Sequence, residues 1–479
     1  MGTALVLGGS VIGSALALQL ARSGWRVQVV DDEFDLFCGP DVALRPRPGA
    51  PHTVHAHGFM ARALYELATR LPDVRDDLLD AGAPVVTLEQ LVSPLRYDGG
   101  RPGDDALTSL RVRRITLDRV IGAALAREPG IERVVGRAAG LLYDVGSVPV
   151  VHGLVLRDGR ELRADLVVDA AGRRSPVTGW LDAIGAAPSE RVDRCRVRYY
   201  SRHFRLGTGE VPRPNLGFAE VHQFASFAHL LFLGDNDTAT LALSVHDEDP
   251  VLRRARHPEA FTALAAANPA FARWHAALEP ISPVFCLGAL DNRLRYPAGN
   301  GGPHVLGLVQ VGDALAMTNP TRGRGVAMGL AAAGRLHDLL VTGHAGVELA
   351  LAYDAWVRDV LAVYYRETVA SDAELLQRFR SSLFGDEVPR NAPAAELPEG
   401  HPVSSAEIER SAGSDADLFR VLLRATMLLD DERHIASSSV VHDVRRVLAA
   451  EGTPEPPRPR PTDGLNDRAV VAETLAAYA

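Results

Sequence analysis

The sequence predicts an α/β protein: a three-layer, Rossmann-like domain built on a parallel sheet, with an inserted antiparallel-sheet domain and a C-terminal helical region. Three observations predict this fold class. The first thirty residues have the pattern strand, glycine-rich turn, helix, strand; strand-like segments follow one another between about 194 and 290; and α/β character returns near 305, before a long helical stretch. Alternating strands and helices favour a parallel sheet, whereas consecutive strands favour an antiparallel one.

The N-terminal segment has the pattern of a βαβ unit that binds a dinucleotide. After an apolar strand over 4–7, the places of the three glycines in a GxGxxG turn are taken by Gly8, Ser10 and Gly13, and a helix follows. Such a turn brings backbone amides and a helix N-terminus to a pyrophosphate. Asp31 ends the second strand, where an acidic side chain can accept hydrogen bonds from ribose hydroxyls. These four residues and Ile12 are predicted cofactor contacts; the alternative is a plain βα turn.

The middle of the chain contains further helices and a strand of this domain, followed by a separate sheet layer. One helix is expected over 59–79 and another over 117–127, and the apolar run over 166–169 predicts a buried parallel strand. Beyond it, β-branched and aromatic runs predict a separate sheet layer. These runs lie at 197–204, 230–233 and 238–245.

Three regions are therefore predicted. A discontinuous cofactor-binding domain comprises residues 1–93, 110–190 and 295–345. A substrate-binding sheet domain comprises 191–294, with 94–109 as a possible contribution. A helical region comprises 346–479 and includes a proline-rich segment at 452–464.

A second glycine-rich segment follows a predicted strand over 305–311. It has an aspartate at the strand end, then an Asn-Pro pair, then a Gly-x-Gly that opens a helix of small residues. An acid at a strand end can hold the hydroxyls of a cofactor, and such a helix start can direct amides at a ring edge that collects negative charge. The alternative is a glycine-capped loop unrelated to the first motif. The predicted contacts here are Asp313, Pro320, Gly323, Gly325 and Val326.

Together the two segments resemble a known family. The pattern Gly-Asp, Asn-Pro-x-x-Gly-x-Gly, with Asp-Ala-Ala-Gly-Arg at 169–173 and the Gly-x-Ser-x-x-Gly start, is similar to class A FAD-dependent monooxygenases of the para-hydroxybenzoate-hydroxylase type. Within them it is most similar to the flavin epoxidases of polyether-antibiotic biosynthesis. The resemblance implies that FAD is the cofactor and that Arg47, Arg114 and Asp169 contact it. Without the family, each arginine suits a surface position and Asp169 a buried strand-end cap.

Several positions depart from the family pattern. Arg324 stands where a histidine or glutamine is common, the Thr-Arg pair at 321–322 where an aliphatic and an aromatic residue are usual, and His52 where a glutamine is usual. These positions are expected to face the flavin or the substrate. His55 and His57 have the spacing of a metal pair, but no acidic or cysteine partner lies nearby in the sequence, so we predict no metal site.

The implied activity is monooxygenation, in which one oxygen atom from O₂ enters a largely apolar small molecule by epoxidation or hydroxylation, in secondary-metabolite biosynthesis. No second glycine-rich βα turn is present for a nicotinamide cofactor. NADH or NADPH is therefore expected to dock transiently, or a separate flavin reductase to supply reduced flavin. No catalytic side chain is assigned, because the chemistry belongs to the cofactor. The residues expected to line the substrate pocket, with core packing or surface charge as the alternative, are Tyr199, Tyr200, Arg202, Phe224, Phe227 and Arg324.

Two other functions suit the same scaffold. One is an FAD-dependent dehydrogenase or double-bond reductase, in which substrate reduces the flavin without oxygen. The other is a non-catalytic flavin-binding protein.

The composition excludes or disfavours several other classes of protein. A formal net charge of -9 and a pI near 6.0 disfavour nucleic acid or an anionic membrane as the main partner. All 51 basic residues are arginine, which disfavours P-loop proteins, Schiff-base enzymes and flavin halogenases, since each is expected to need a lysine. No apolar run has the roughly 18 residues of a membrane helix, and no export signal is found, so we expect a cytoplasmic protein without a membrane span.

Overall fold

The structure, a computed structural model, describes residues 2–34, 46–91, 97–207, 211–215, 219–275, 277–288, 290–386, 403, 405–451 and 463–478. Most of the predicted proline-rich segment, 452–462, lies outside these residues. The chain divides into two compact units. Unit 1 comprises Met1–Pro84, Val112–Cys195 and Leu290–Val369, and unit 2 comprises Val85–Arg111, Arg196–Ala289 and Ala370–Ala479. The boundaries of the three regions predicted from the sequence remain a prediction.

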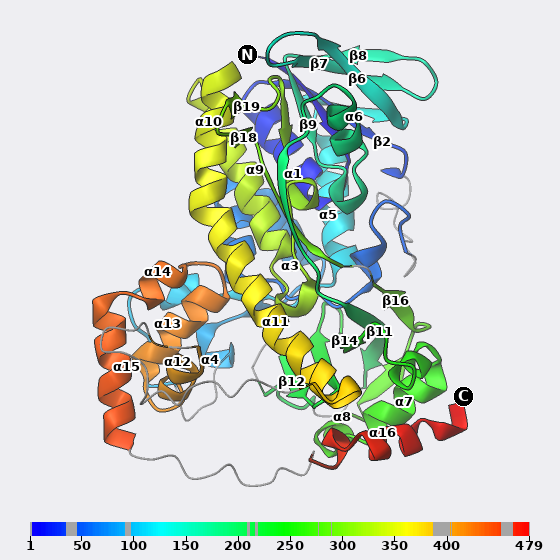
Figure 1. Cartoon of the computed structure of the whole chain (residues 1–479), viewed down its shortest axis with the longest axis vertical. Helices are drawn as coiled ribbons and strands as arrows, with labels where there is room; N and C mark the ends of the chain where they lie inside the picture. The colour runs from blue at the N-terminus through cyan, green and yellow to red at the C-terminus, as the bar shows by residue number, and fades with distance from the viewer. Residues whose placement is uncertain are drawn as a thin grey trace. The chain divides into compact units, whose positions relative to one another are not determined.

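A five-stranded parallel sheet forms the centre of unit 1 (Figure 1). Its strands, in spatial order, are β20 (Leu308–Gln310), β9 (Leu166–Asp169), β1 (Thr3–Leu7), β2 (Arg26–Asp31) and β5 (Ile131–Val135). β1 pairs in parallel with β2 on one side and with β9 on the other. The strand order therefore reverses beside β1, and ligands of such sheets bind at the carboxyl ends of the strands at this point.

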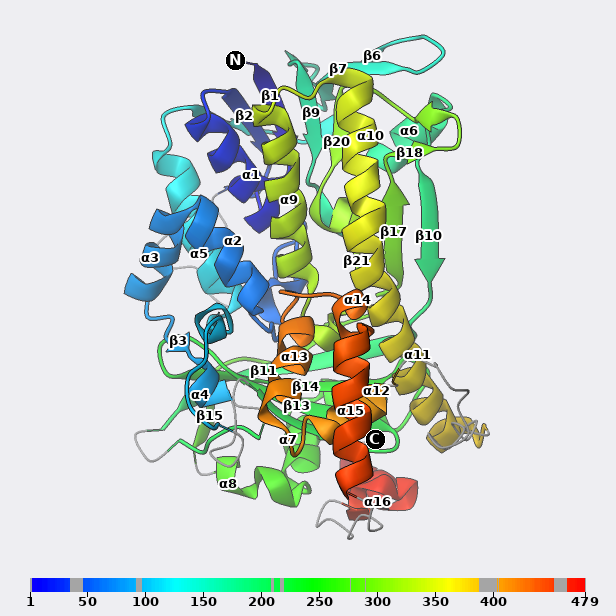
Figure 2. The same cartoon turned by 90° about the vertical axis from the view of Figure 1, so that its left-hand side faces the viewer.

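Helices and small sheets cover this parallel sheet. α1 packs against α9 and α5, and Figure 2 shows α1 and α9 side by side. The helices of unit 1 are α1 (Val11–Arg22), α2 (Ala61–Arg70), α3 (Pro72–Asp80), α5 (Arg114–Arg127), α6 (Val177–Ala183), α9 (Gly325–Val341) and α10 (Gly346–Trp356). Its other strands are β6 (Ala138–Asp144), β7 (Val150–Leu156), β8 (Glu161–Arg163), β10 (Ser189–Asp193), β17 (Asn292–Tyr296), β18 (Ala298–Gly299), β19 (Gly302–Pro303) and β21 (Ala316–Met317).

The prediction of one helix over 59–79 is wrong. The structure has two helices there, α2 and α3, with Leu71 between them. Pro72 explains the break, because proline has no N–H to continue the helix and disfavours helical geometry in the residue before it. Proline at the first position of α3 is in turn well suited to start a helix.

Unit 2 contains the second sheet, whose paired strands all run antiparallel. The strand order is β12-β13-β14-β11-β15, and β16 also pairs with β11. β14 is buried at every position, as expected for a central strand. The strands are β11 (Val197–Leu206), β12 (Ala219–Gln223), β13 (Phe227–Leu233), β14 (Thr238–His246), β15 (Leu278–Pro280) and β16 (Phe285–Leu287), with β3 (Val85–Val86) and β4 (Ser109–Leu110) in a separate pair.

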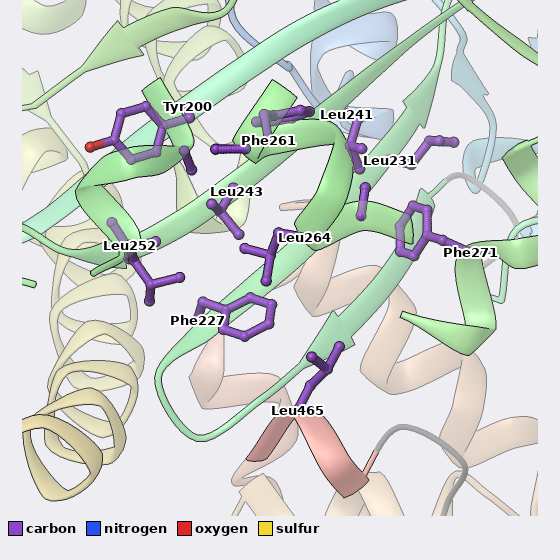
Figure 3. Close-up of a cluster of buried hydrophobic side chains, with 14 of the residues drawn as sticks. Tyr200, Phe227, Leu231, Leu241, Leu243, Leu252, Phe261, Leu264, Phe271 and Leu465 are labelled. Atoms are coloured by element: carbon purple, nitrogen blue, oxygen red, sulfur yellow. The ribbon is translucent and has the colours of Figure 1, made fainter. Parts of the chain in front are cut away.

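Helices pack on this sheet and continue to the C-terminus. Figure 3 shows the core, in which Phe227 from the sheet and Leu264 from α7 lie in one buried cluster with Leu465 from the C-terminal end. The helices are α4 (Leu88–Leu91), α7 (Pro258–Ala266), α8 (Ala272–His275), α12 (Ser405–Ser411), α13 (Ala416–Thr426), α14 (Glu432–Ile435), α15 (Ser438–Glu451) and α16 (Arg468–Thr474). α11 (Ala362–Phe384) begins in unit 1 and ends in unit 2.

The predicted fold class is confirmed. The chain has a parallel sheet with helices, separate antiparallel sheets and a helical C-terminal region. Among the described helices, none is long and apolar enough to cross a bilayer.

Candidate dinucleotide site

The turn after β1 brings backbone segments closer together than any side chain would allow. Gly8 has a φ of +103°, and a Cβ there would lie 2.5 Å from the carbonyl oxygen of Ala170. A Cβ at Gly13 would lie 1.9 Å from the carbonyl oxygen of Gly8. Only glycine fits at either position. The predicted turn therefore forms directly before α1, and the start of α1 is the kind of helix end that binds phosphate.

Asp31 connects the second strand to this turn. Its Oδ2 accepts a hydrogen bond of 2.7 Å from the Gly9 amide, and its Oδ1 accepts one of 2.7 Å from the Glu33 amide. Each carboxylate oxygen has a further lone pair. Asp31 can thus fix the turn and still accept hydrogen bonds from a ribose.

Both predicted arginines lie buried beside Ser10. Arg47 donates to Glu33 and to Asp118, each at 3.2 Å. Arg114 donates to Asp118 Oδ2 at 2.6 Å and to the Ser10 hydroxyl oxygen at 2.9 Å. Each of these two arginine side chains is less than a tenth exposed. The alternative of a surface position is therefore wrong for both, and a phosphate contact stays a prediction that their place beside the turn supports.

A cavity of about 680 Å³ opens at this edge of the parallel sheet. Its lining includes Gly8, Ser10, Asp31 and Arg47 from the predicted set, and Trp180 from α6. Cavities of roughly 300–1,000 Å³ are typical of small-molecule and cofactor sites. Four of the residues predicted from the sequence thus line one nucleotide-sized space.

The second motif lies against the first through Ile12. A Cβ at Gly312 would lie 3.3 Å from the Ile12 side chain, and one at Gly329 of α9 would lie 2.7 Å from it. Ile12 therefore fits against two glycines, one from each part of the second motif. This packing brings the short helix at Gly312–Ala314 and the start of α9 next to the N-terminus of α1.

Asp313 has a carboxylate without a protein partner. It accepts no hydrogen bond from any residue that the structure describes. Burial raises the pKa of Asp313, while the charges of Arg114 and Arg173 lower it. A Cβ at Gly325 would lie 4.0 Å from Asp313 Oδ1, so the carboxylate lies beside the first turn of α9. A half-buried carboxylate with no partner among the described residues is available to a donor from a ligand.

The loop before α9 has the geometry that its glycines predict. Gly323 has a φ of +64°, its amide donates to the Pro320 carbonyl oxygen at 2.8 Å, and a Cβ there would lie 3.2 Å from the Gly58 nitrogen. Val326 is buried in the first turn of α9. The loop is thereby held close to 58–60, and the amides at the start of α9 follow it.

Asp169 directly precedes Ala170 and Ala171, which line this cavity. Its carboxylate accepts hydrogen bonds from Ser175 at 2.8 Å, from Gln310 at 2.9 Å and from the Ala171 amide at 3.1 Å. Burial raises the pKa of Asp169, and these hydrogen bonds lower it. Its contacts are those of a strand-end cap that orders the segment lining the cavity. A direct contact with the cofactor stays a prediction.

The predicted pocket residues of unit 2 have partners within that unit. Arg202 donates to the Ser282 carbonyl oxygen at 3.1 Å and to Thr262 Oγ1 at 3.0 Å. The rings of Phe224 and Phe227 stack with centroids 4.5 Å apart. A role in a substrate pocket stays a prediction for these residues. All four aromatic side chains of the set are buried: Tyr199, Tyr200, Phe224 and Phe227.

His52 has an unexpected place beside Arg114. Its Nε2 lies 3.2 Å from Arg114 Nη1, which can only donate, so this ring nitrogen accepts. Burial first, and then the charge of Arg114, hold the pKa of His52 well below its ordinary value, so the ring is neutral at pH 7. His57 Nδ1 lies 2.9 Å from the His55 carbonyl oxygen. Within the described part of the chain, no three His, Cys, Asp or Glu side chains form a group that could hold a metal.

Sequence reasoning missed the acids that hold the two arginines. Asp118 had a signal, because it follows Arg114 by one helical turn, a spacing that brings opposite charges together. Glu33 had none: it accepts from the Gly49 amide at 2.8 Å and from Arg47, and both partners lie far along the chain.

The fold and the turn are of the kind found in α/β proteins that bind dinucleotides, and comparison with known proteins places the fold more narrowly. No protein-family model matches the chain. Protein Rv3254 of Mycobacterium tuberculosis (strain ATCC 25618 / H37Rv) is 26% identical over 371 residues, which cover 70% of this chain and 72% of that protein.

Solved structures with a similar fold include flavin-dependent enzymes. PqsL, a probable FAD-dependent monooxygenase from Pseudomonas aeruginosa, is 18% identical with a TM-score of 0.59 and covers 80% of this chain and 100% of its own. PqsL has also been solved in complex with 2-aminobenzoylacetate. The flavin-dependent brominase Bmp2 is 15% identical with a TM-score of 0.62 and covers 94% of this chain and 98% of its own. The chain therefore has the fold of FAD-dependent monooxygenases and halogenases.

Proposed function

We propose that the chain is an FAD-dependent monooxygenase that inserts one oxygen atom from O₂ into a largely apolar small molecule. The observation that carries the proposal is the contact of Ile12 with Gly312 and Gly329. It brings a pyrophosphate-binding turn and the unpaired carboxylate of Asp313 to one edge of the parallel sheet. Their proximity supports the assignment of the two motifs, which the sequence predicts separately, to one elongated site.

The residues present fit FAD. The turn at Gly8–Gly13 and the start of α1 would take the pyrophosphate, with Arg47 and Arg114 as the predicted cations beside it. Asp31 would accept hydrogen bonds from the adenosine ribose. Asp313, whose carboxylate has no donor among the described residues, would accept hydrogen bonds from the ribityl hydroxyls. The amides at the start of α9 would face the pyrimidine edge of the ring.

Bound FAD, once reduced, supplies the two electrons that activate O₂. In the net reaction, two electrons, two protons, O₂ and substrate give the oxygenated product and water. The electrons come from NADH or NADPH, or from reduced flavin delivered by a reductase. The protein must hold the substrate and exclude water, so that oxygen reaches the substrate instead of leaving as H₂O₂.

Monooxygenation is favoured over halogenation although both occur among the structural neighbours. The chain contains no lysine. A flavin halogenase is expected to need an active-site lysine, so this chain lacks the residue for that step. The complex of PqsL with a small organic molecule supports a small-molecule substrate. Epoxidation and hydroxylation are both compatible with the proposal, and the relation to polyether epoxidases is part of it.

The test is the reaction of the reduced protein with oxygen. The FAD-loaded full chain is reduced with dithionite and mixed with oxygenated buffer in a stopped-flow spectrometer. A transient absorbance that precedes the return of the oxidised spectrum is expected. Direct return without it, in the presence of a panel of planar aromatic and polyene compounds, would favour the dehydrogenase or reductase. A protein that binds no flavin would refute the proposal.

Asp313→Asn is expected to weaken FAD binding about tenfold or more, because a charged acceptor becomes a neutral one and one of its two acceptor oxygens becomes a donor. The same change should stabilise the protein without FAD at pH 7.5. Burial raises the folded-state pKa of Asp313 above its ordinary value, so the folded protein binds this proton more tightly than the unfolded chain. Wild-type stability therefore falls as pH rises from about 4 through the raised pKa, and asparagine removes that loss.

Flavin fluorescence titration measures the affinity, and thermal unfolding of the flavin-free protein at pH 5 and pH 7.5 measures the stability. The matched control is Asp158→Asn, because Asp158 is exposed and pairs with Arg160 at 2.7 Å. Wild-type FAD affinity in Asp313→Asn would show that Asp313 is not a cofactor contact.

A further inference from the structure

Arg324 is a buried cation at the start of α9. It is 3% exposed and lies between Gly323 and Gly325, where the sequence departs from the family pattern. Its Nη1 donates to Glu367 Oε2 at 2.8 Å and to the Tyr364 carbonyl oxygen at 3.2 Å. Glu367 is mostly buried as well. α11 therefore fixes the position of this charge.

The hydrogen bonds of Arg324 are incomplete. Its Nε is buried and has no hydrogen-bond partner among the described residues. An unpaired buried donor lowers the stability of the folded protein. It indicates either an acceptor supplied by a ligand, or a guanidinium whose function depends on its charge and not on its hydrogen bonds. The unpaired carboxylate of Asp313 lies beside the first turn of the same helix. One unused donor and one unused acceptor thus belong to the same end of α9.

We propose that Arg324, held by Glu367, is a fixed positive charge that stabilises the reduced form of the bound FAD. The inference rests on the proposed cofactor. Two electrons and one proton convert oxidised flavin to its anionic reduced form, so one negative charge is gained, and it collects at the pyrimidine edge. The N-terminal end of α9 would direct positive partial charge at that edge. Arg324 stands at the same end of the helix, with its guanidinium fixed by α11.

Glu367 has two opposed effects in this arrangement. It positions the guanidinium through the 2.8 Å ion pair, and its own negative charge weakens the field of Arg324. The charges of the pair act on reduction with opposite signs. Loss of Arg324 should make the flavin harder to reduce, and loss of the Glu367 charge should make it easier.

The experiment is an anaerobic potentiometric titration of the FAD-loaded full chain with a reference dye. Arg324→Gln is expected to lower the equilibrium constant for flavin reduction about tenfold, which for a two-electron couple is about 30 mV. Glu367→Gln is expected to raise it by a similar factor. Arg324→Lys keeps the charge and should restore most of the wild-type potential. Loosened packing would not give shifts of opposite sign.

The matched control is Arg70→Gln. Arg70 makes an equally close pair with Asp338 at 2.7 Å, near the other end of α9 and roughly 20 Å along the helix from Arg324. It should cost stability and leave the potential unchanged. A protein that binds no FAD would refute the proposed function. Bound FAD with an unchanged potential in Arg324→Gln, or a lowered one in Glu367→Gln, would overturn this inference alone. If Arg324→Gln does not fold, the Glu367 and lysine variants decide.

Discussion

Gly13→Ala is expected to lower FAD affinity at least a hundredfold and to lower the free energy of unfolding by about 3 kcal/mol. The new Cβ would lie 1.9 Å from the Gly8 carbonyl oxygen and 3.1 Å from the Ala170 Cβ. Neither neighbour can move away easily, because the Gly8 amide is held by Val30 at 2.9 Å and the Ala170 amide by Leu7 at 2.8 Å. The turn must open, and the amides that are proposed to bind the pyrophosphate move with it.

Flavin content after purification and urea unfolding measure the two effects. Gly179→Ala is the matched control, because Gly179 is also a helical glycine of unit 1 and a Cβ there would meet nothing within 4 Å. The control should keep its FAD and gain up to about 1 kcal/mol, since alanine favours the helix. Full FAD binding in Gly13→Ala would show that the turn is not the pyrophosphate site.

The features that sequence could predict are those set by neighbouring residues. The βαβ turn is one, because Gly8, Gly13 and Asp31 act within one strand-turn-helix-strand unit and their spacing is fixed by that unit. The second motif is another, since its glycines shape one loop. The sequence does not show that Ile12 joins the two motifs, because that contact depends on how α9 packs against α1.

The features that sequence missed depend on partners far along the chain. Glu33 is an example: its function depends on Arg47 and on the Gly49 amide, and no local pattern marks it. Arg324 is another. Its sequence position suggested a residue facing the flavin or the substrate, which stays a prediction. The sequence did not show that its guanidinium contacts Tyr364 and Glu367 on α11. A charged side chain can reach several directions from one backbone position, so its partner is settled only by the packing of the helices.

The ends of helices and strands also divide into those set by neighbouring residues and those set by distant contacts. The break at Pro72 follows from local chemistry and could have been predicted. The strand β20, at Leu308–Gln310, is shorter than the apolar run over 305–311. An apolar run is set by burial, whereas a strand is set by its pairing, and β20 pairs with β9 over three residues only.

Asp249→Ala is expected to lower the free energy of unfolding by about 3 kcal/mol, because one buried carboxylate serves two purposes. Its side chain is 1% exposed. Its two oxygens pair with both terminal nitrogens of Arg468, at 2.6 and 2.8 Å, and its Oδ1 also accepts from the Val251 and Leu252 amides at 2.9 and 3.0 Å. Alanine would leave these donors unpaired.

Asp249→Ala should destabilise the C-terminal segment more than the rest of unit 2. Arg468 opens α16, whose Val471 is fully buried in the core of unit 2, as is Leu475 just beyond it. Amide hydrogen exchange over 468–475 is therefore expected to accelerate more than exchange in β14, since the docked helix opens first. Urea unfolding measures the overall loss.

The matched control is Glu279→Ala. Glu279 pairs with Arg205 at 3.6 Å, but the two side chains are 68% and 63% exposed. An exposed pair of this kind contributes little, so the change should stay within about 0.5 kcal/mol. Equal losses for the two variants would show that the Asp249 pair contributes no more than a surface one. The docking of the C-terminal segment would then depend on its apolar side chains, such as Val471 and Leu475, and on its other hydrogen bonds, such as the one from Arg254 to the Leu475 carbonyl oxygen.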